Sequence, residues 1–271
     1  MVEPTRETVR LDRALVERSL ARSRGHARDL VLAGCVRLGE QVIRRPSYGV
    51  HPEDHLDVAA GPGPVWVGRA AEKLSAAVAR WEPDGLTVQG SACVDVGAST
   101  GGFTQVLLHA GARSVVAIDV GSGQLVQSIR EDPRVTELSR RHVLTVSADE
   151  VAAPVDLIVV DVSFISVTAV LDHITSWMGS TGDVVILVKP QFEVGRAGVS
   201  RRGIVTSATQ RAAAVRRVVA AAYDSGFALH DAMSSPLTGS RGNREYLLRL
   251  APHQPGMMDR ARGHRLAETL T

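Results

Sequence analysis

The chain has 271 residues, of which 44% are hydrophobic, 22% charged and 4% aromatic, with a formal net charge of +2 at pH 7. This composition supplies enough apolar side chain for one or two packed cores and excludes a disordered polyelectrolyte. Only two of the 31 cationic residues are lysines, Lys73 and Lys189, and the other 29 are arginines. An arginine-rich coding bias explains these numbers as well as a function does, so the positions of the lysines must decide.

Two cysteines, Cys35 and Cys93, are too few for a disulfide framework or a metal site, and Cys93 lies in an apolar run typical of a buried thiol. The first ten residues carry charged side chains and lack the apolar core of a signal peptide. Apolar runs such as residues 155–162 fall short of the roughly 18 residues that a membrane span needs. We therefore expect a cytoplasmic protein with no membrane span and no metal.

A break in composition at residues 59–64, Ala-Ala-Gly-Pro-Gly-Pro, excludes helix and central strand and divides the chain. In the short unit before the break, the pattern predicts a first helix and then a second one that begins at Ser23 and ends before Gly34. Two strands at residues 36–38 and 41–43, joined by a turn, are expected to follow.

Arginine is concentrated in this unit: residues 10–45 hold nine arginines against four acidic residues. Such a run is usually a solvated face, but the stretches RLDRALVER (10–18) and ARSRGHARDLVLAGCVRL (21–38) resemble the RNA-binding domain of ribosomal small-subunit protein four. The resemblance implies that arginines on two helices and a hairpin contact RNA phosphates, which is how sequence-independent RNA contacts are made. The candidate residues are Arg10, Arg13, Arg18, Arg22, Arg24, Arg28 and Arg37.

After the break, apolar strands alternate with helices, which predicts a doubly wound, Rossmann-like, mainly parallel sheet behind a small α+β domain, an α/β chain overall. Ligands of such sheets bind at the carboxyl ends of the strands. The expected elements are a helix at 69–81, strands at 92–96, 114–119, 143–146, 156–161 and 183–189, helices from Phe103 and Gln124, a long helix at 207–223, and strands at 227–233 and 245–250.

A glycine-rich loop, Asp95 to Phe103, follows the first of these strands and opens a helix. Its glycines let the backbone approach a ligand, and the helix N-terminus offers free N–H groups. The dinucleotide fingerprint G-x-G-x-x-G fails because Ser99 replaces its second glycine. The hydrolase pattern G-x-S-x-G is met with Ser99 as nucleophile, but neither His230 nor His253 sits convincingly in a catalytic loop.

The third interpretation is a loop that binds S-adenosylmethionine. It predicts an acidic residue at the end of the next strand to accept hydrogen bonds from both ribose hydroxyls, and Asp119 stands there. Asp149 is a candidate contact of the adenine amino group, although a solvated aspartate at a helix start explains it equally well. The expected cofactor contacts are Asp95, Gly97, Ser99, Gly101, Gly102, Phe103, Asp119 and Asp149.

Charged residues also end two of the apolar strands, Asp161 after one and Lys189 after another. Because a buried charge is costly without a partner, a purely structural ion pair between them is the alternative to a catalytic role. Lys73 lies on the helix before the first strand, and Glu245 opens the last strand. Both lysines therefore fall in or beside one candidate cleft.

At these positions the chain resembles the TlyA family of ribosomal RNA 2′-O-methyltransferases, which are also called hemolysins. The resemblance spans about residues 9–250, and the stretch KPQFEVG at 189–195 is long enough to be a specific signal. It implies S-adenosylmethionine as cofactor, ribosomal RNA or a ribosomal subunit as partner, and cytidine as target. It further implies that the catalytic Lys-Asp-Lys-Glu tetrad of TlyA and FtsJ enzymes corresponds to Lys73, Asp161, Lys189 and Glu245.

The tetrad chemistry explains the two lysines. A ribose hydroxyl must lose its proton as its oxygen attacks the methyl carbon, and a positioned base contributes about 10²- to 10⁴-fold to such a step. Lys189 accepts the proton only when neutral; Lys73 and the sulfonium favour that form, while Asp161 and Glu245 orient the amine and oppose it. Arginine cannot replace it, because its guanidinium stays protonated.

The chain departs from the family on the nucleoside-binding side, at Gln105, Ser122 and residues 138–142. Two alternatives therefore stay open: a methyltransferase of this fold that acts on a small molecule, and a non-catalytic RNA-binding or hemolysin-like protein. The expected organisation is an RNA-binding domain at 9–60, a linker at 61–68, a methyltransferase domain at 69–251 and a flexible tail at 252–271.

Overall fold

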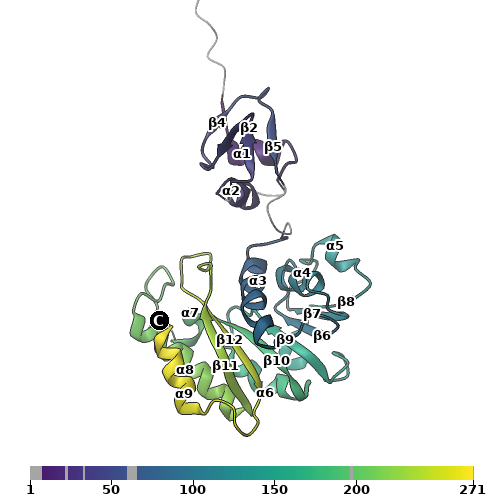
Figure 1. The fold of residues 1–271 in the computed structure, drawn as a ribbon, viewed down its shortest axis with the longest axis vertical. Helices are drawn as coiled ribbons and strands as arrows, with labels where there is room; N and C mark the ends of the chain where they lie inside the picture. Colours follow the sequence, from purple (N-terminus) through teal and green to yellow (C-terminus); the bar gives the residue numbers. More distant parts are fainter. Residues whose placement is uncertain (1–7, 22–23, 33, 60–65, 196–197, 271) are drawn as a thin grey trace, which may run out of the picture. The chain divides into compact units, whose positions relative to one another are not determined.

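The computed structural model describes residues 8–21, 24–32, 34–59, 66–195 and 198–270 (Figure 1). The chain divides into two compact units, Met1–Val65 and Trp66–Thr271, and each is considered by itself. Among the residues so described, no helix combines the length and the apolar character that crossing a lipid bilayer requires.

The N-terminal unit is a small α+β fold whose core joins apolar side chains of both helices to those of a three-stranded sheet. The helix and strand positions predicted for it are confirmed, and Ser23 lies outside the described residues. Its elements are β1 (Val9–Arg10), α1 (Leu11–Glu17), α2 (Arg24–Leu32), β2 (Val36–Leu38), β3 (Gln41–Ile43), β4 (Gly49–Val50) and β5 (Leu56–Val58).

The C-terminal unit is built on one seven-stranded sheet, confirming the predicted α/β class (Figure 1). The strand order is β11 (Phe227–Ser234), β12 (Tyr246–Pro252), β10 (Met178–Val188), β9 (Val155–Val160), β6 (Ala92–Val96), β7 (Ser114–Asp119) and β8 (Val135–Ser139). From β10 to β8 neighbouring strands are parallel, whereas β12 runs antiparallel to β10 and β11 runs antiparallel to β12.

Helices cover both faces of this sheet. Successive strand residues such as Leu157 and Ile158 point to opposite faces and belong to different apolar clusters. The Leu157 face packs against α3 (Ala70–Trp81), α4 (Gly102–His109) and α5 (Gln127–Arg130). The Ile158 face packs against α6 (Thr168–Thr175), α8 (Ala208–Asp224) and α9 (Arg260–Thr269). A short helix, η1 (Glu82–Asp84), follows α3.

The strand predicted at 143–146 is wrong. Val143 and Val146 are buried while Leu144 and Thr145 are exposed, and this spacing of three belongs to a 3₁₀ turn rather than to an alternating strand. The segment forms η2 (Val143–Thr145), and the edge strand is β8, which was not predicted. The helix expected from Gln124 is limited to the single turn of α5.

The flexible tail expected at 252–271 is also wrong for the described residues, because α9 packs on α8 and β11. Small residues allow this approach: Gly263 and Ala267 are buried, and a Cβ on Gly263 would lie 3.2 Å from the Tyr223 hydroxyl. The Asp259 side chain caps the helix by accepting a hydrogen bond from the backbone N–H of Arg262 at 2.7 Å.

Ala267→Asp is expected to lower the free energy of unfolding by about 3 kcal/mol, because it buries an unpaired carboxylate between α9 and the core. Ala261→Asp, at an exposed position of the same helix, should change it by less than about 0.5 kcal/mol. Urea unfolding of both variants measures the difference, and equal values would show that α9 does not contribute to the fold.

Candidate active site

Strand topology brings three of the predicted catalytic residues to one edge of the sheet. Asp161 directly follows β9 and Lys189 directly follows β10, and these neighbouring strands are parallel. Glu245 directly precedes β12, whose first residue pairs with the last residue of the antiparallel β10. Lys73 lies in the first turn of α3.

Two nearly buried ion pairs form there. Lys73 Nζ lies 2.5 Å from Glu245 Oε2, with side-chain exposures of 10% and 3%. Lys189 Nζ lies 2.5 Å from Asp161 Oδ1 in an ion pair, and it donates a hydrogen bond to Ser163 Oγ at 2.8 Å. Removing either partner of such a pair leaves a buried charge uncompensated, so each pair restrains both elements that carry it.

All four charged residues line one cavity of about 610 Å³ in the C-terminal unit. Part of the glycine-rich loop lines the same cavity, so the structure brings most of the predicted catalytic and cofactor residues together. From the predicted cofactor set, the lining residues are Gly97, Ser99, Gly102 and Phe103.

The glycine-rich loop turns sharply between β6 and α4. Gly97 has φ +88°, and a Cβ there would lie 2.4 Å from the Asp161 carbonyl oxygen, so only glycine allows the two loops to approach this closely. Ser99 also adopts a left-handed conformation, with φ 48°, which costs energy for a residue with a side chain. The loop thus places backbone N–H groups of the α4 N-terminus at the cavity.

Asp119, predicted to accept hydrogen bonds from the ribose hydroxyls, is the last residue of β7 and binds the glycine-rich loop. Its Oδ2 accepts a hydrogen bond from Ser99 N at 2.8 Å, and its Oδ1 accepts one from Gly121 N at 2.7 Å. An ionised carboxylate has about four lone-pair sites, so about two remain for hydroxyl donors. Asp119 does not itself line the cavity.

Two other residues predicted to contact the cofactor serve packing instead. Asp95 lies inside β6 with 0% exposure, and its Oδ2 accepts a hydrogen bond from Thr104 Oγ1 at 2.6 Å. Burial raises the pKa of Asp95 to about 7, and the hydrogen bond from Thr104 opposes this shift. A Cβ on Gly101 would lie 2.7 Å from Ile129 of α5, so this glycine permits helix packing.

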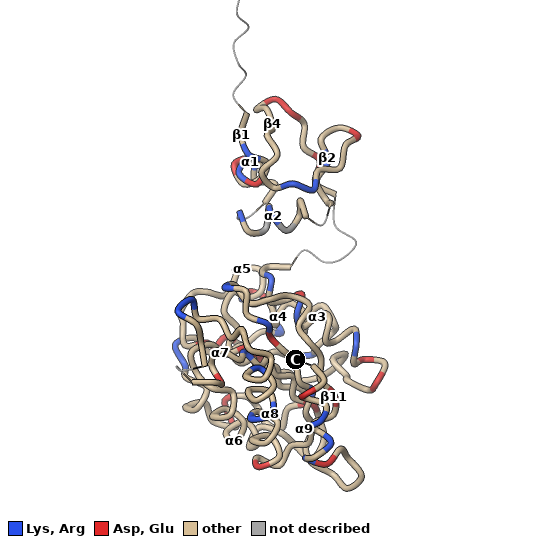
Figure 2. Tube along the Cα trace, turned by 90° about the vertical axis from the view of Figure 1, so that its left-hand side faces the viewer, with Lys and Arg blue, Asp and Glu red and all other residues tan. Residues whose placement is uncertain are grey.

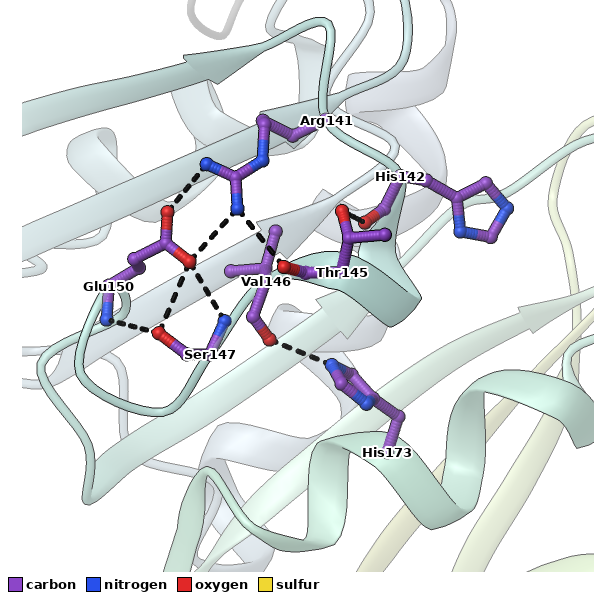
Figure 3. Close-up of polar contacts among 7 residues, drawn as sticks. All are labelled: Arg141, His142, Thr145, Val146, Ser147, Glu150 and His173. Carbon is purple, nitrogen blue, oxygen red and sulfur yellow. Dashed lines mark hydrogen bonds and ion pairs between the residues drawn. The ribbon is translucent and has the colours of Figure 1, made fainter.

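Figure 3 shows the segment after β8, which contains Asp149. The Arg141 guanidinium contacts both carboxylate oxygens of Glu150, at 2.5 and 2.9 Å, and donates to the Thr145 carbonyl at 3.0 Å. The Arg141 hydrogen bond lowers the pKa of Glu150 to about 2. Asp149 is exposed in this segment, follows η2 rather than a strand, and does not line the cavity. The structure therefore does not support the placement expected for an adenine contact.

The hydrolase interpretation is not supported by the geometry. Ser99 Oγ donates a hydrogen bond to Gln124 Oε1 at 3.1 Å, whereas a catalytic serine needs a histidine at that place. His230 lies on β11, and His253 lies just after β12. Two strands, β10 and β9, separate β12 from the strand that precedes Ser99.

Sequence reasoning missed Ser163 and two aromatic residues at the cavity. Ser163 is two residues after Asp161, where a loop serine carries no periodic signal. Phe164 is 92% exposed with φ 67°, and its ring centroid lies 5.4 Å from that of Phe192. Both rings line the cavity. An exposed aromatic residue in a strained conformation, next to a predicted tetrad residue, was the signal that only the structure reveals.

In the N-terminal unit, where Figure 2 colours the arginine positions blue, Arg22 lies outside the described residues, and the other six predicted RNA contacts differ in their hydrogen bonds and ion pairs. Arg18 is half-buried and donates to the carbonyl oxygens of Asp54 at 2.5 Å and His51 at 2.7 Å, so it stabilises the unit itself. The Asp12 carboxylate forms ion pairs with Arg10 at 2.9 Å and with Arg24 at 3.4 Å. Among the six, the exposed residues are Arg10, Arg13, Arg24, Arg28 and Arg37.

An open sheet with a glycine-rich loop after one strand and an acidic residue after the next defines a Rossmann-like nucleoside-binding fold. The FtsJ-like methyltransferase model matches residues 66–251, and the S4 domain model matches residues 9–56. The chain therefore belongs to the FtsJ-like methyltransferase family, and its N-terminal unit contains an S4 domain.

Individual relatives agree with this assignment. The chain is 43% identical over 239 residues to the 16S/23S rRNA (cytidine-2′-O)-methyltransferase TlyA of Mycobacterium tuberculosis, a match that covers 88% of each protein. It is 35% identical to hemolysin A of Brachyspira hyodysenteriae, covering 88% of this chain and 98% of that protein. The solved structure of a Streptococcus thermophilus protein described as a hemolysin matches with a TM-score of 0.71 and 31% identity, covering 98% and 96% of the two chains.

Asp95→Asn is expected to change the pH dependence of stability. Native Asp95 keeps its proton up to about pH 7, whereas an unfolded aspartate loses it near pH 4. Between about pH 4 and 7 the native state binds more protons, so this group makes the free energy of unfolding fall with rising pH, by at most about 1.4 kcal/mol per unit.

Urea unfolding between about pH 4 and 8 measures that slope, which the asparagine variant should flatten. Asp172→Asn, at an exposed carboxylate of the same unit, should leave the slope as in the parent chain. An unchanged slope in Asp95→Asn would show that Asp95 is already ionised in the folded protein.

Proposed function

We propose that the protein transfers a methyl group from S-adenosylmethionine to the 2′-hydroxyl of a cytidine ribose in ribosomal RNA. One observation carries this proposal: the ion pairs Lys73–Glu245 and Lys189–Asp161 line the same cavity as part of the glycine-rich loop. The relatives named as rRNA (cytidine-2′-O)-methyltransferases support it.

The residues at the cavity fit the cofactor. The first turn of α4, which begins at Gly102, offers backbone N–H groups at the cavity, and the Asp119 carboxylate beside the cavity keeps lone pairs available for two ribose hydroxyls. When bound, S-adenosylmethionine supplies an electrophilic methyl carbon on a sulfonium. The carboxylates of Asp161 and Glu245 offset the positive charge that the two lysines place in the same cavity.

The geometry of Lys189 suits a proton acceptor. A neutral amine has two hydrogens and one lone pair; Ser163 Oγ accepts one hydrogen, and the Asp161 carboxylate in contact with Nζ offers an acceptor for the other. The lone pair then takes the remaining direction at Nζ and receives the proton of the attacking hydroxyl. The ribose oxygen forms its bond to the methyl carbon as the carbon–sulfur bond breaks, and S-adenosylhomocysteine leaves.

Two features favour RNA over a small-molecule substrate. The S4 domain supplies exposed arginines, which suit a phosphate backbone. Phe164 and Phe192 supply an aromatic surface at the cavity, and side chains of this kind stack on the unpaired bases of RNA. A small metabolite needs neither feature.

Incubation with methyl-labelled S-adenosylmethionine tests the function, with undermethylated ribosomal subunits, purified ribosomal RNA and a small-metabolite extract as substrates. We expect label in RNA, at a phosphodiester that resists alkaline cleavage, because methylation blocks the 2′-oxygen that attacks the phosphate. Label in metabolites but never in RNA would establish the small-molecule alternative instead.

Lys189→Arg is expected to reduce methyl transfer by at least about 100-fold, because a guanidinium keeps the charge but does not accept the proton. Calorimetry should find the affinity for S-adenosylmethionine within about twofold, since the glycine-rich loop is unchanged. Arg216→Lys, at an exposed ion pair with Glu268, is the matched control and should transfer normally. Activity retained in Lys189→Arg would remove Lys189 as the base.

A further inference from the structure

Glu193 is a buried carboxylate that the proposed chemistry leaves unexplained. It ends the one-turn helix α7 (Pro190–Glu193), which begins directly after Lys189. Its exposure is 3%, and it does not line the cavity that contains the two ion pairs. Burying a carboxylate costs several kcal/mol unless its oxygens are bound, so its contacts indicate what it does.

Both oxygens of Glu193 bind the loop between β9 and α6. Oε2 accepts a hydrogen bond from Ser166 Oγ at 2.5 Å, and Oε1 accepts one from Val167 N at 2.9 Å. Because Ser166 uses its only hydroxyl hydrogen on Glu193, the Thr168 hydroxyl, 2.7 Å away, donates to Ser166. The hydrogen bonds therefore form a chain, in which each bond polarises the next.

The same loop provides both acceptors for the Lys189 amine. Asp161 lies at its start, where the backbone N–H of Asp161 donates to the Val96 carbonyl at 2.9 Å. Ser163 follows, and Phe164 holds its left-handed conformation in the middle of the loop. The start of the loop is thus fixed to the sheet, and Glu193 holds its end. Ser163, which accepts the hydrogen bond from Lys189, and the strained Phe164 lie between these two anchors.

We propose that Glu193 is a positioning residue for Lys189, an inference that rests on the proposed role of Lys189 as base. By holding the loop end, Glu193 keeps Ser163 in place to accept one amine hydrogen while Asp161, fixed by the sheet, stays in ionic contact with Nζ, and the lone pair is thereby directed into the cavity. A displacement of about 1 Å at a reacting group costs up to about 100-fold in rate. The buried carboxylate is retained for this alignment.

Kinetics of Glu193→Ala and Glu193→Gln test the proposal. In the alanine variant we expect kcat to fall about 30-fold, with KM for RNA and the affinity for S-adenosylmethionine within about twofold. Glutamine keeps an acceptor for Val167 N–H, and its amide group can donate to Ser166, so it should recover most of the activity. Should Glu193→Ala fail to fold, Ser166→Ala, which removes the hydroxyl that donates to Glu193 Oε2, should lower kcat by a smaller factor with KM for RNA within about twofold, and an unchanged kcat would contradict the proposal.

Asp231→Asn is the matched control for lost stability. Its half-buried carboxylate accepts hydrogen bonds from Trp81 Nε1 at 2.8 Å and from Arg80 at 2.9 Å, and it does not line the cavity. It should lower the melting temperature without lowering kcat. If kcat were the same in Glu193→Ala as in Asp231→Asn, the proposal would be overturned.

The lysine content offers a readout that needs no activity. With only Lys73 and Lys189 in the chain, ¹³C-lysine labelling yields two side-chain NMR signals, which Lys73→Arg assigns. Glu193→Ala should move the Lys189 signal and leave that of Lys73 in place, while Asp231→Asn should move neither. An unmoved Lys189 signal would refute positioning even if the parent enzyme methylates RNA. A parent enzyme that never methylates RNA would refute the proposed function while the signals still report on Glu193.

Discussion

Two buried lysine–carboxylate pairs are the constraint on which the C-terminal unit depends. A buried ammonium group costs several kcal/mol unless a carboxylate lies against it, so Lys73 and Lys189 each require a partner at contact distance. Those partners, Glu245 and Asp161, lie at the ends of different strands. The neighbouring order β12, β10, β9, with β12 reversed, is what brings the end of β9 and the start of β12 to the same edge.

The loops around these pairs are constrained in turn. The turn at Gly97 passes so close to the Asp161 carbonyl that a Cβ would collide with it. The loop after Asp161 is held at its far end by Glu193, from the segment that follows Lys189. The glycine-rich loop and the loops carrying the second ion pair therefore form one packed arrangement, in which a shift of any one displaces the others.

The residues at the strand ends could be predicted from the hydrophobic pattern of the sequence. A charge that ends an apolar strand is conspicuous, which is why Asp161 and Lys189 were identified from the pattern. Lys73 and Glu245 were assigned through the family resemblance, because their pairing joins residues 172 positions apart. Ser163 lies in a loop and Glu193 ends a one-turn helix, and hydrogen bonds in such short segments leave no trace in hydropathy.

The wrong predictions have similarly local causes. Two valines spaced by three residues, Val143 and Val146, fit a strand by composition and a 3₁₀ turn by spacing. The C-terminal segment is rich in arginine and resembles a tail, yet α9 docks through residues as small as Gly263 and Ala267, which contribute little to any hydrophobic pattern. Asp95 was taken for a cofactor contact because it adjoins the glycine-rich loop, whereas strand alternation turns its side chain into the interior.

The arginines elsewhere in this unit show why the two lysines are informative. Arg249 is 4% exposed and pairs with Asp183 at 2.6 Å, and Arg211 is 9% exposed with a hydrogen bond to the Tyr246 hydroxyl. Burial and ion pairing therefore do not in themselves make this chain use lysine, since arginine meets both demands outside the cavity. The proposed mechanism distinguishes the cavity, because it requires a proton to be transferred there, and an amine can lose its charge to accept a proton whereas a guanidinium cannot. An arginine-rich coding bias explains the 29 arginines and leaves unexplained why both exceptions form ion pairs in one cavity.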